Sequence, residues 1–236
     1  MTQSKESPQT PVAIVTGVSR GFGHAVASAL VERGWIVVGD ARGGIGLNDV
    51  ARHQGSSRNI SVPGDVSDPS HRLALINTAV ETGPLRLLIN NASRLGPSPQ
   101  PALADYPADE LGAVYATNVF APLALTQQAL PALIANAGTV VNVTSDAAVE
   151  PYPGWGGYGS SKAALEQISA ILAAEVPAVA VYVFDPGDMR TEMHQDAFPG
   201  EDISDRPLPS AVAPGLVALI ESDHPSGRTR VAEFVS

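Results

Sequence analysis

The chain of 236 residues contains no cysteine, and this absence excludes disulfides and thiolate metal sites. It also fits a reducing compartment, so we expect a cytoplasmic protein. The histidines are scattered without the spacing of metal ligands, at His24, His53, His71, His194 and His224. We therefore expect no metal site.

Long apolar runs and an excess of positive charge are also missing. The longest apolar run near a predicted strand covers residues 179–184, far short of the roughly 20 residues of a membrane-spanning helix. Residues 1–10 are polar, so we expect a disordered tail there and not a signal peptide. The formal net charge of −10 argues against nucleic-acid binding, which needs a basic face. We expect neither a membrane nor a nucleic acid as partner.

The alternation of apolar runs and helical stretches predicts a single α/β domain over residues 11–236. We expect strands at 12–15, 35–39, 60–62, 85–89, 139–143, 179–184 and 230–234, and helices at 21–33, 69–82, 109–118, 122–135, 158–175 and 211–221. Such alternation gives βαβ units, and hence a Rossmann-type doubly wound parallel sheet with helices on both faces. Ligands bind such a sheet outside the carboxyl ends of its strands.

A glycine-rich loop follows the first predicted strand. Gly17, Gly21 and Gly23 allow a tight turn and let the backbone approach a pyrophosphate at the start of the next helix. The spacing differs from the commoner G-x-G-x-x-G fingerprint. Its position between a buried strand and a helix nevertheless indicates dinucleotide binding.

Asp40 closes the second predicted strand, 23 residues after Gly17 (40 − 17). A carboxylate there can accept hydrogen bonds from both ribose hydroxyls and would repel a 2′-phosphate, which favours NAD(H) over NADP(H). Arg20 and Arg42 are near in sequence and could supply a counter-charge, so NADP(H) stays open. A solvated strand end is the other interpretation of Asp40.

Lysine is scarce, and this scarcity singles out Lys162. The chain has two lysines and twelve arginines (14 − 2), and the other lysine, Lys5, lies in the polar tail. On a helix Lys162 stands on the same face as Tyr158. A cation about 4 Å from a phenol contributes about 4 kcal/mol in a partly screened site, which lowers the phenol's pKa of about 10 by up to about three pH units. The pair predicts proton exchange near neutral pH; an ordinary surface tyrosine is the alternative.

Together, the glycine loop and this pair resemble the single-domain type of the short-chain dehydrogenase/reductase family. The matches follow the family's order and run from about residue 11 to the C-terminus. Residues 65–66, 90–93 and 186–191 resemble its adenine-contacting pair, its NNAG motif and its PGxVxT segment. The resemblance implies cofactor contacts by Thr16, Gly17, Ser19, Arg20, Gly21, Phe22, Gly23, Asp40, Asp65, Val66, Asn91, Ala92, Tyr158, Lys162, Pro186, Gly187, Met189 and Thr191.

The resemblance also implies a catalytic tetrad of Asn118, Ser145, Tyr158 and Lys162. Ser145 lies 27 residues after Asn118 (145 − 118) and 13 before Tyr158 (158 − 145), which suits the family. The implied reaction moves a hydride between a nicotinamide cofactor and a ketone or secondary alcohol. Tyr158 would exchange the proton, Lys162 would lower its pKa and bind ribose, Ser145 would donate to the substrate oxygen, and Asn118 would hold a water. Thr144 is a possible second hydroxyl, with strand packing as the alternative.

Three departures from the family pattern are visible. Ser93 replaces the glycine of NNAG, which brings into question any backbone conformation there that only glycine adopts. Met189 replaces a β-branched residue of the PGxVxT segment. Residues 42–46 are glycine-rich and leave only a short second helix, which would loosen the adenine side of the site.

Residues 188–210 are expected to form a substrate lid. Its lining is expected from Met193, His194, Phe198 and Pro199, with Tyr152, Pro153 and Trp155 opposite. These side chains favour an apolar or cyclic carbonyl substrate, unless they merely pack the lid onto the body. Acidic residues in the lid, Glu201, Asp202 and Asp205, would disfavour anionic substrates.

Two usable faces on the helix at 158–175 suit a subunit contact, and the resemblance implies a homodimer or homotetramer. Two other functions stay open. One is a nucleotide-sensing regulatory protein of the same fold without turnover. The other is an epimerase or dehydratase relative that shares Y-x-x-x-K, although the roughly 45 residues after Thr191 leave little room for the larger substrate domain usual in such relatives.

Overall fold

A computed structural model describes residues 9–41 and 58–234 of the chain. The predicted tail is therefore described only at residues 9–10, and Arg42 and the glycine-rich segment 42–46 lie outside the described residues. Among the described residues, no helix has the length and apolar character needed to cross a membrane.

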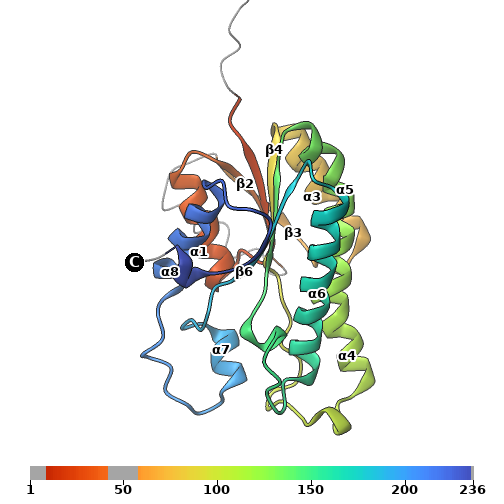
Figure 1. Cartoon of the computed structure of the whole chain (residues 1–236), viewed down its shortest axis with the longest axis vertical. Helices are drawn as coiled ribbons and strands as arrows, with labels where there is room; N and C mark the ends of the chain where they lie inside the picture. The colour runs from red at the N-terminus through yellow and green to blue at the C-terminus, as the bar shows by residue number, and fades with distance from the viewer. Residues whose placement is uncertain (1–8, 42–57, 235–236) are drawn as a thin grey trace, which may run out of the picture.

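The described residues form one parallel sheet with helices on both faces, which confirms the predicted fold class (Figure 1). The strands are β1 Val12–Val15, β2 Ile36–Ala41, β3 Asn59–Pro63, β4 Leu85–Asn90, β5 Thr139–Val143, β6 Ala180–Asp185 and β7 Gly227–Arg230. The helices are α1 Gly21–Glu32, α3 Pro69–Thr82, α4 Ala108–Tyr115, α5 Ala121–Ala135, α6 Gly156–Glu175, α7 Glu192–Ala197 and α8 Pro209–Ile220.

The strand order is β3-β2-β1-β4-β5-β6-β7. The chain adds strands on one side of β1 up to β3 and then on its other side from β4 onward, so the topological switch point lies between β1 and β4. The glycine loop and the Asn90-Asn91 segment leave the carboxyl ends of those two strands, so both reach the crevice at the switch point. The carboxyl ends of β5 and β6 lie beside them because all paired strands run parallel.

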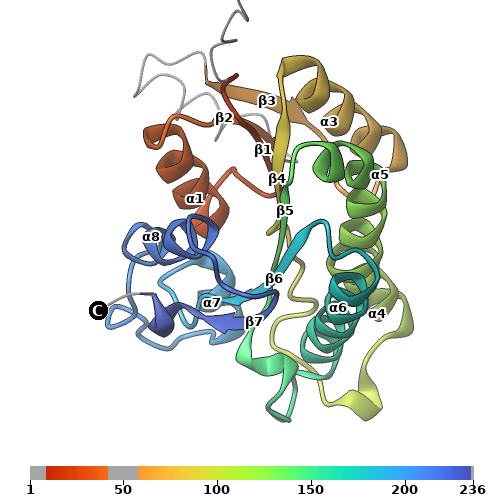
Figure 2. The same ribbon diagram turned by 45° about the horizontal axis from the view of Figure 1, so that its top comes forward.

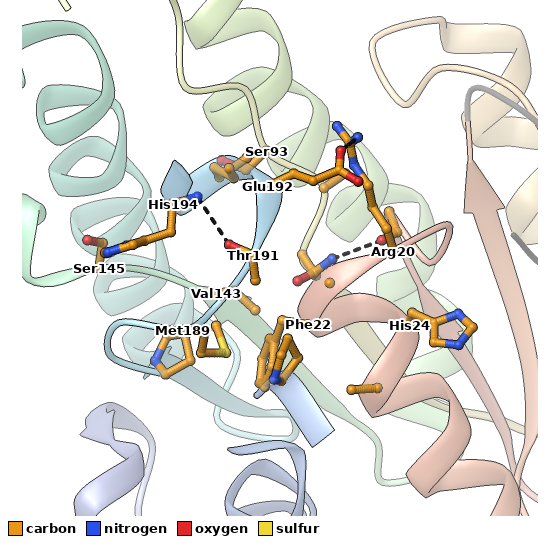
Figure 3. A pocket seen from close by; sticks show the side chains of 18 of the residues that line it. Arg20, Phe22, His24, Ser93, Val143, Ser145, Met189, Thr191, Glu192 and His194 are labelled. Atoms are coloured by element: carbon orange, nitrogen blue, oxygen red, sulfur yellow. Dashed lines mark hydrogen bonds and ion pairs between the residues drawn. The ribbon is translucent and has the colours of Figure 1, made fainter. Parts of the chain in front are cut away.

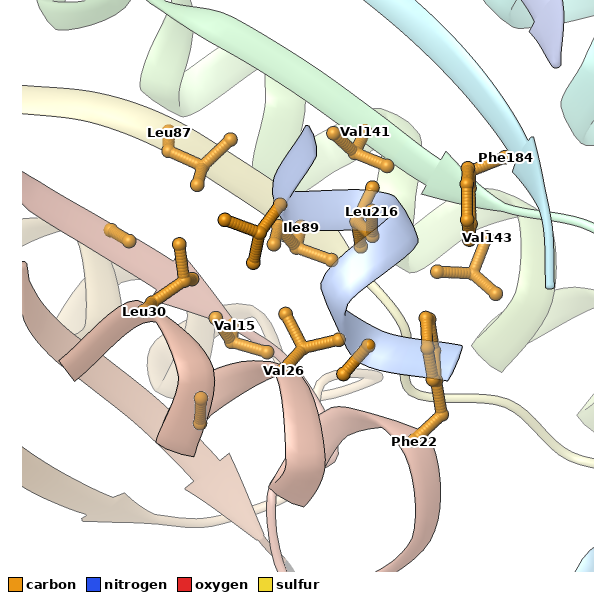
Figure 4. Close-up of a cluster of buried hydrophobic side chains, with 14 of the residues drawn as sticks. Val15, Phe22, Val26, Leu30, Leu87, Ile89, Val141, Val143, Phe184 and Leu216 are labelled. Atoms are coloured by element: carbon orange, nitrogen blue, oxygen red, sulfur yellow. The ribbon is translucent and has the colours of Figure 1, made fainter. Parts of the chain in front are cut away.

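Helices α1 and α8 cover one face of the sheet, and α3, α5 and α6 cover the other (Figure 2). All four residues of β1 are fully buried, as expected for a strand covered on both faces. On the face of the sheet covered by α1, side chains of β4, β5 and β6 pack against Val15, Val26, Leu30 and Leu216 (Figure 4). This packing holds α1, the helix that follows the glycine loop, against the sheet.

Two sequence expectations were wrong in detail. The last strand is Gly227–Arg230, not 230–234, and Val231–Glu233 forms a 3₁₀ turn. The Glu233 side chain accepts a hydrogen bond from the Arg230 amide at 2.7 Å, which turns the chain away from the sheet. The helices expected at 109–118 and 122–135 are joined without a loop, because a π-helical turn over Ala116–Phe120 connects α4 to α5.

Candidate active site

The predicted site residues converge on one cavity of about 1230 Å³ at the carboxyl ends of β1, β4, β5 and β6 (Figure 3). Most of them line it directly: Gly17, Ser19, Arg20, Gly21, Phe22, Asp40, Asp65, Val66, Asn91, Ala92, Ser145, Tyr158, Lys162, Pro186, Gly187, Met189 and Thr191. Thr16, Gly23 and Asn118 are not in the lining. Their contacts, described next, hold the lining residues in place.

Thr16 and Asn91 tie the glycine loop to the end of β4. The Thr16 hydroxyl accepts hydrogen bonds from the amides of Asn91 and Ala92, both at 2.9 Å. The Asn91 side chain donates back to the carbonyl of Thr16 at 2.8 Å. A Cβ on Gly23 would lie 2.3 Å from this Asn91 nitrogen, so glycine is needed at that position. The conformation of the loop therefore depends on both strands of the switch point.

Asp40 is turned into the protein. Its carboxylate accepts a hydrogen bond from the Gly17 amide at 2.6 Å and lies 3.3 Å from Nε2 of His71, and the residue is 2 % exposed. A Cβ on Gly64 would lie 2.2 Å from the His71 ring, so the chain there makes room for the imidazole. Both carboxylate oxygens thus have partners in the protein, where the sequence led us to expect them to face ribose hydroxyls.

Asn118 lies in the π-helical turn and is fully buried. Its side-chain oxygen accepts hydrogen bonds from the Arg94 amide at 2.8 Å and from the Ser93 hydroxyl at 3.1 Å. Its side-chain nitrogen donates to the Arg94 carbonyl and the Ser161 hydroxyl, both at 2.9 Å. Since π-helical turns often occur at functional sites, this deviation from α-helical geometry is consistent with a site residue at position 118.

Ser93 occupies its position without backbone strain. Ala137 is the one non-glycine residue with positive φ among the described residues, so Ser93 does not adopt a conformation reserved for glycine. The Ser93 side chain lines the cavity beside Asn118. The serine at this position therefore adds a hydroxyl to the site.

Lys162 and Tyr158 project from α6 toward the end of β5. The Lys162 ammonium donates to the Val143 carbonyl at 2.8 Å and lies 5.5 Å from the centre of the Tyr158 ring. Lys162 is 2 % exposed and is one of the largest fully enclosed side chains among the described residues. Both groups line the cavity.

Burial is the largest influence on the pKa of both Tyr158 and Lys162. It raises the pKa of Tyr158 to about 12, against a hydrogen bond with Ser93 that acts to lower it, and the charges of Asp185 and Asp146 raise it further. Burial also lowers the pKa of Lys162 to about 8, against the opposing charge of Glu166. We expected Lys162 to lower the pKa of Tyr158, but this pKa is raised, because desolvation of the buried phenol is the largest influence on it.

Ser145 follows β5 and has an acidic neighbour that the sequence reading passed over. Its hydroxyl donates to the Asp146 carboxylate at 3.0 Å and accepts from the Ala147 amide at 3.2 Å. The Tyr152 hydroxyl donates to the other Asp146 oxygen at 3.0 Å. Asp146 itself lines the cavity.

A network of charged side chains connects β7 and α6 to the ends of β5 and β6, next to the site. Arg228 of β7 donates to Asp185 at 2.9 Å and to Glu166 at 3.1 Å. Glu166 accepts from the Thr144 hydroxyl at 2.6 Å, so Thr144 is committed to this network. Sequence reasoning missed Asp185 and Arg228, because their partners lie far away along the chain. The only available signal was the acidic residue directly before Pro186-Gly187.

The 188–210 segment contributes part of the cavity lining. The Arg190 amide donates to the Pro207 carbonyl at 2.9 Å, which closes the base of the loop. Helix α7 begins where the Thr191 hydroxyl accepts a hydrogen bond from the His194 amide at 3.1 Å. Glu192 forms an ion pair with Arg20, which joins this segment to the glycine loop (Figure 3).

Aromatic side chains surround the Tyr158 end of the cavity. The ring of Trp155 lies 5.8 Å from Tyr158, 6.3 Å from Tyr152 and 5.7 Å from Phe198, measured between centroids. These rings line the cavity together with Met193, His194 and Pro153, as the sequence predicted, whereas Pro199 is not in the lining.

The chain resembles known proteins over most of its length. The family model for short chain dehydrogenases matches residues 11–202. Sepiapterin reductase of Mus musculus is 33% identical over 207 residues (78% of this chain, 76% of that protein), and serine 3-dehydrogenase of Agrobacterium fabrum is 35% identical over 185 residues (76% and 72%). A short chain dehydrogenase from Shigella flexneri, solved in complex with NADP, is 28% identical with a TM-score of 0.85, covering 93% of this chain and 95% of that one.

Proposed function

Because the chain belongs to the short-chain dehydrogenase family of oxidoreductases, we propose that it moves a hydride between a nicotinamide cofactor and a ketone or secondary alcohol. The observation that carries this proposal is the convergence of Ser145, Tyr158 and Lys162 with the glycine loop on one cavity. The names of the relatives include a pterin reductase and an amino-acid dehydrogenase, so they do not by themselves indicate one substrate.

The glycine loop fits the pyrophosphate of a dinucleotide. Gly17 and Gly21 have φ angles of +72° and +61°, which glycine adopts without strain. The nearest atom to a Cβ on Gly21 would be 3.7 Å away, so the backbone is open to a ligand at the start of α1. A bound nicotinamide cofactor would supply or accept the hydride. The residues proposed to hold it are the cavity-lining cofactor residues named above, with Thr16 and Gly23 shaping the loop.

Tyr158 is the proposed acid and base. Its phenol is protonated at neutral pH, so it can give its proton to the substrate oxygen during reduction. Ser145 is proposed to orient that oxygen through its hydroxyl. Lys162 supplies the positive charge beside the ring, and we propose that it binds the ribose hydroxyls of the cofactor. The Asn118 side chain accepts two hydrogen bonds through its oxygen and donates two through its nitrogen, which uses its full capacity, so we assign it a positioning role beside Ser161 and Arg94.

The proposed preference for NAD(H) over NADP(H) depends on the negative charge of Asp40 and not on hydrogen bonds from Asp40 to the ribose. The Asp40 oxygens are engaged by Gly17 and His71, yet the carboxylate lies at the carboxyl end of β2, where it would repel a 2′-phosphate. Arg20, one of the two expected counter-charges, pairs with Glu192.

Asp40→Asn is expected to remove this discrimination. The wild type should bind NADH about tenfold more tightly than NADPH, and the two dissociation constants should converge in the variant because the repelling charge is gone. Calorimetric titration of each cofactor measures both. Asp109→Asn removes an exposed carboxylate that does not line the cavity and should leave the ratio unchanged. Equal binding of both cofactors by the wild type would contradict the proposed preference.

The aromatic lining supports an apolar or cyclic carbonyl substrate. We expect turnover when NADH or NADPH oxidation is followed at 340 nm against a panel of cyclic and aromatic ketones. Cofactor binding without turnover of any carbonyl compound would instead favour the nucleotide-sensing alternative. Epimerase or dehydratase activity would appear as substrate conversion without net cofactor oxidation.

Exposed apolar side chains on the outer helices support the proposed homo-oligomer. Phe120 is 60% exposed, while Ile134 of α5 and Ile171 of α6 are about half exposed. Apolar side chains of this size on adjacent helices suit a helix–helix contact between identical subunits.

A further inference from the structure

Asp146 places a carboxylate in the lining of the cavity, beside Ser145, and no described residue supplies it with a cationic partner. Among the described residues, none of the ion pairs involves Asp146. Its described side-chain hydrogen bonds are those from Ser145 and Tyr152, one to each oxygen. Since a carboxylate can accept about four hydrogen bonds, roughly two acceptor positions are left for a ligand.

The position of this charge works against an uncharged substrate. Ser145 donates its one hydroxyl hydrogen to the Asp146 carboxylate at 3.0 Å, so to act as the proposed donor it has to turn this hydrogen from Asp146 to the substrate oxygen. During reduction that oxygen gains negative charge, which a neighbouring carboxylate opposes. The same charge raises the pKa of Tyr158. A positive group on the substrate would offset both effects.

The aromatic lining also favours a positively charged group on the substrate. The rings of Tyr152, Trp155 and Phe198 line the cavity around Tyr158, and Trp155 contacts each of the other three. Aromatic faces attract cations, and an ammonium group beside both a ring and a carboxylate is bound favourably. A carboxylate on the substrate would meet repulsion from Asp146.

We propose that the substrate is an amino ketone, or the corresponding amino alcohol, whose ammonium group next to the reacting carbon binds Asp146 and the ring of Tyr152 or Trp155. This inference rests on the proposed oxidoreductase function; it keeps a carbonyl substrate that contacts the aromatic lining but replaces a wholly apolar one with one that carries a positive charge. It makes Asp146 a specificity-determining residue of the site.

The test compares three aryl ketones of similar shape at about pH 6, where an amine is protonated. These are α-aminoacetophenone, neutral α-hydroxyacetophenone and anionic phenylglyoxylate. For the wild type, kcat/KM should be about tenfold higher for the ammonium ketone than for the hydroxy ketone, and lowest for the anion. In Asp146→Asn the ratio of ammonium to hydroxy ketone should fall to near one.

Two further variants guard the interpretation. Glu150→Gln removes an exposed carboxylate close in sequence that does not line the cavity, and it should keep the wild-type ratio. Tyr152→Phe frees one acceptor position on Asp146, so the ammonium preference should persist or increase. An unchanged ratio in Asp146→Asn, or a wild type that favours the neutral or anionic ketone, would overturn the inference.

A binding assay separates this inference from the proposed function. Trp155 lies in the cavity, and the chain's other tryptophan, Trp35, can be replaced by phenylalanine so that fluorescence reports on Trp155 alone. Quenching by 2-amino-1-phenylethanol but not by 1-phenylethane-1,2-diol, lost in Asp146→Asn, would support the ammonium site even if no carbonyl compound were turned over. Turnover without ammonium preference would overturn the inference and leave the oxidoreductase function standing. If neither binding nor turnover occurs, both are wrong.

Discussion

Tyr158→Phe is expected to lower kcat/KM for ketone reduction by about 10²–10⁴, the usual contribution of a positioned acid or base. The phenol is the proposed proton donor to the substrate oxygen, and phenylalanine retains the ring but has no proton to give. The ring's contact with Trp155 and its distance from Lys162 should be little changed, so cofactor affinity should stay within about threefold of the wild type. Steady-state kinetics and calorimetric titration of the cofactor measure the two quantities.

Tyr182→Phe is the matched control for this variant. Tyr182 lies in β6, does not line the cavity, and donates its phenolic hydrogen to the His224 carbonyl at 2.8 Å. This variant loses the same kind of hydroxyl group outside the cavity, so activity should be retained. If Tyr158→Phe kept most of its turnover, Tyr158 could not be the acid.

Lys162→Met is expected to make the protein more stable and nearly inactive. Folding buries the Lys162 ammonium and lowers its pKa from 10.5 to about 8. At roughly 1.4 kcal/mol per pH unit, the buried charge costs about 3 kcal/mol at neutral pH, and methionine removes that cost while filling similar space. The variant also lacks the cation beside Tyr158, so kcat/KM should fall by at least about 10².

The gain in stability should depend on pH in a defined direction. Below about pH 8 the lysine is protonated in both states, and the full cost of burial is present. Between about pH 8 and 10.5 the unfolded chain binds more protons than the folded one, so the wild-type free energy of unfolding rises with pH. The advantage of the variant should therefore be largest at neutral pH and should shrink toward pH 10.

Urea unfolding of both proteins at neutral pH and at about pH 10 tests this prediction. Arg86→Met, which removes an exposed cation from β4, should give no such gain. A Lys162→Met protein less stable than the wild type at neutral pH would show that the hydrogen bond from Lys162 to the Val143 carbonyl outweighs the cost of burying the charge. Above pH 10.5 the free energy of unfolding of both proteins should fall, because folded Tyr158 keeps its proton up to about pH 12 whereas unfolded tyrosine loses it near pH 10.

The sequence predicted the sheet well because buried parallel strands leave a strong local signal. Residues 12–15, 85–89 and 139–143 are short apolar runs between helical stretches, and each became a strand of the sheet. The weaker prediction was the last strand, at the sheet edge, where Gly227–Arg230 has few apolar residues. The run that begins at Val231 had the expected strand composition but forms a turn stabilised by Glu233.

The composition of the candidate site also followed from sequence, because its motifs keep fixed distances from strand ends. The strands β1, β4, β5 and β6 are followed within two residues by Gly17, Asn91, Ser145 and Gly187, so parallel pairing brings these residues to one edge. Knowing which strands are parallel was enough to gather these residues around a common cavity.

Three properties depended on the tertiary structure alone. Asp40 contacts Gly17 and His71, Tyr158 has a raised pKa, and Asp146, beside Ser145, has no ion pair among the described residues. Each is set by burial or by the neighbours that the fold brings into contact, and these act through space over a few ångströms. Local pattern and spacing thus determined the fold and the residues that meet, whereas burial and three-dimensional neighbours decided their protonation, their orientation and the charge that a substrate encounters.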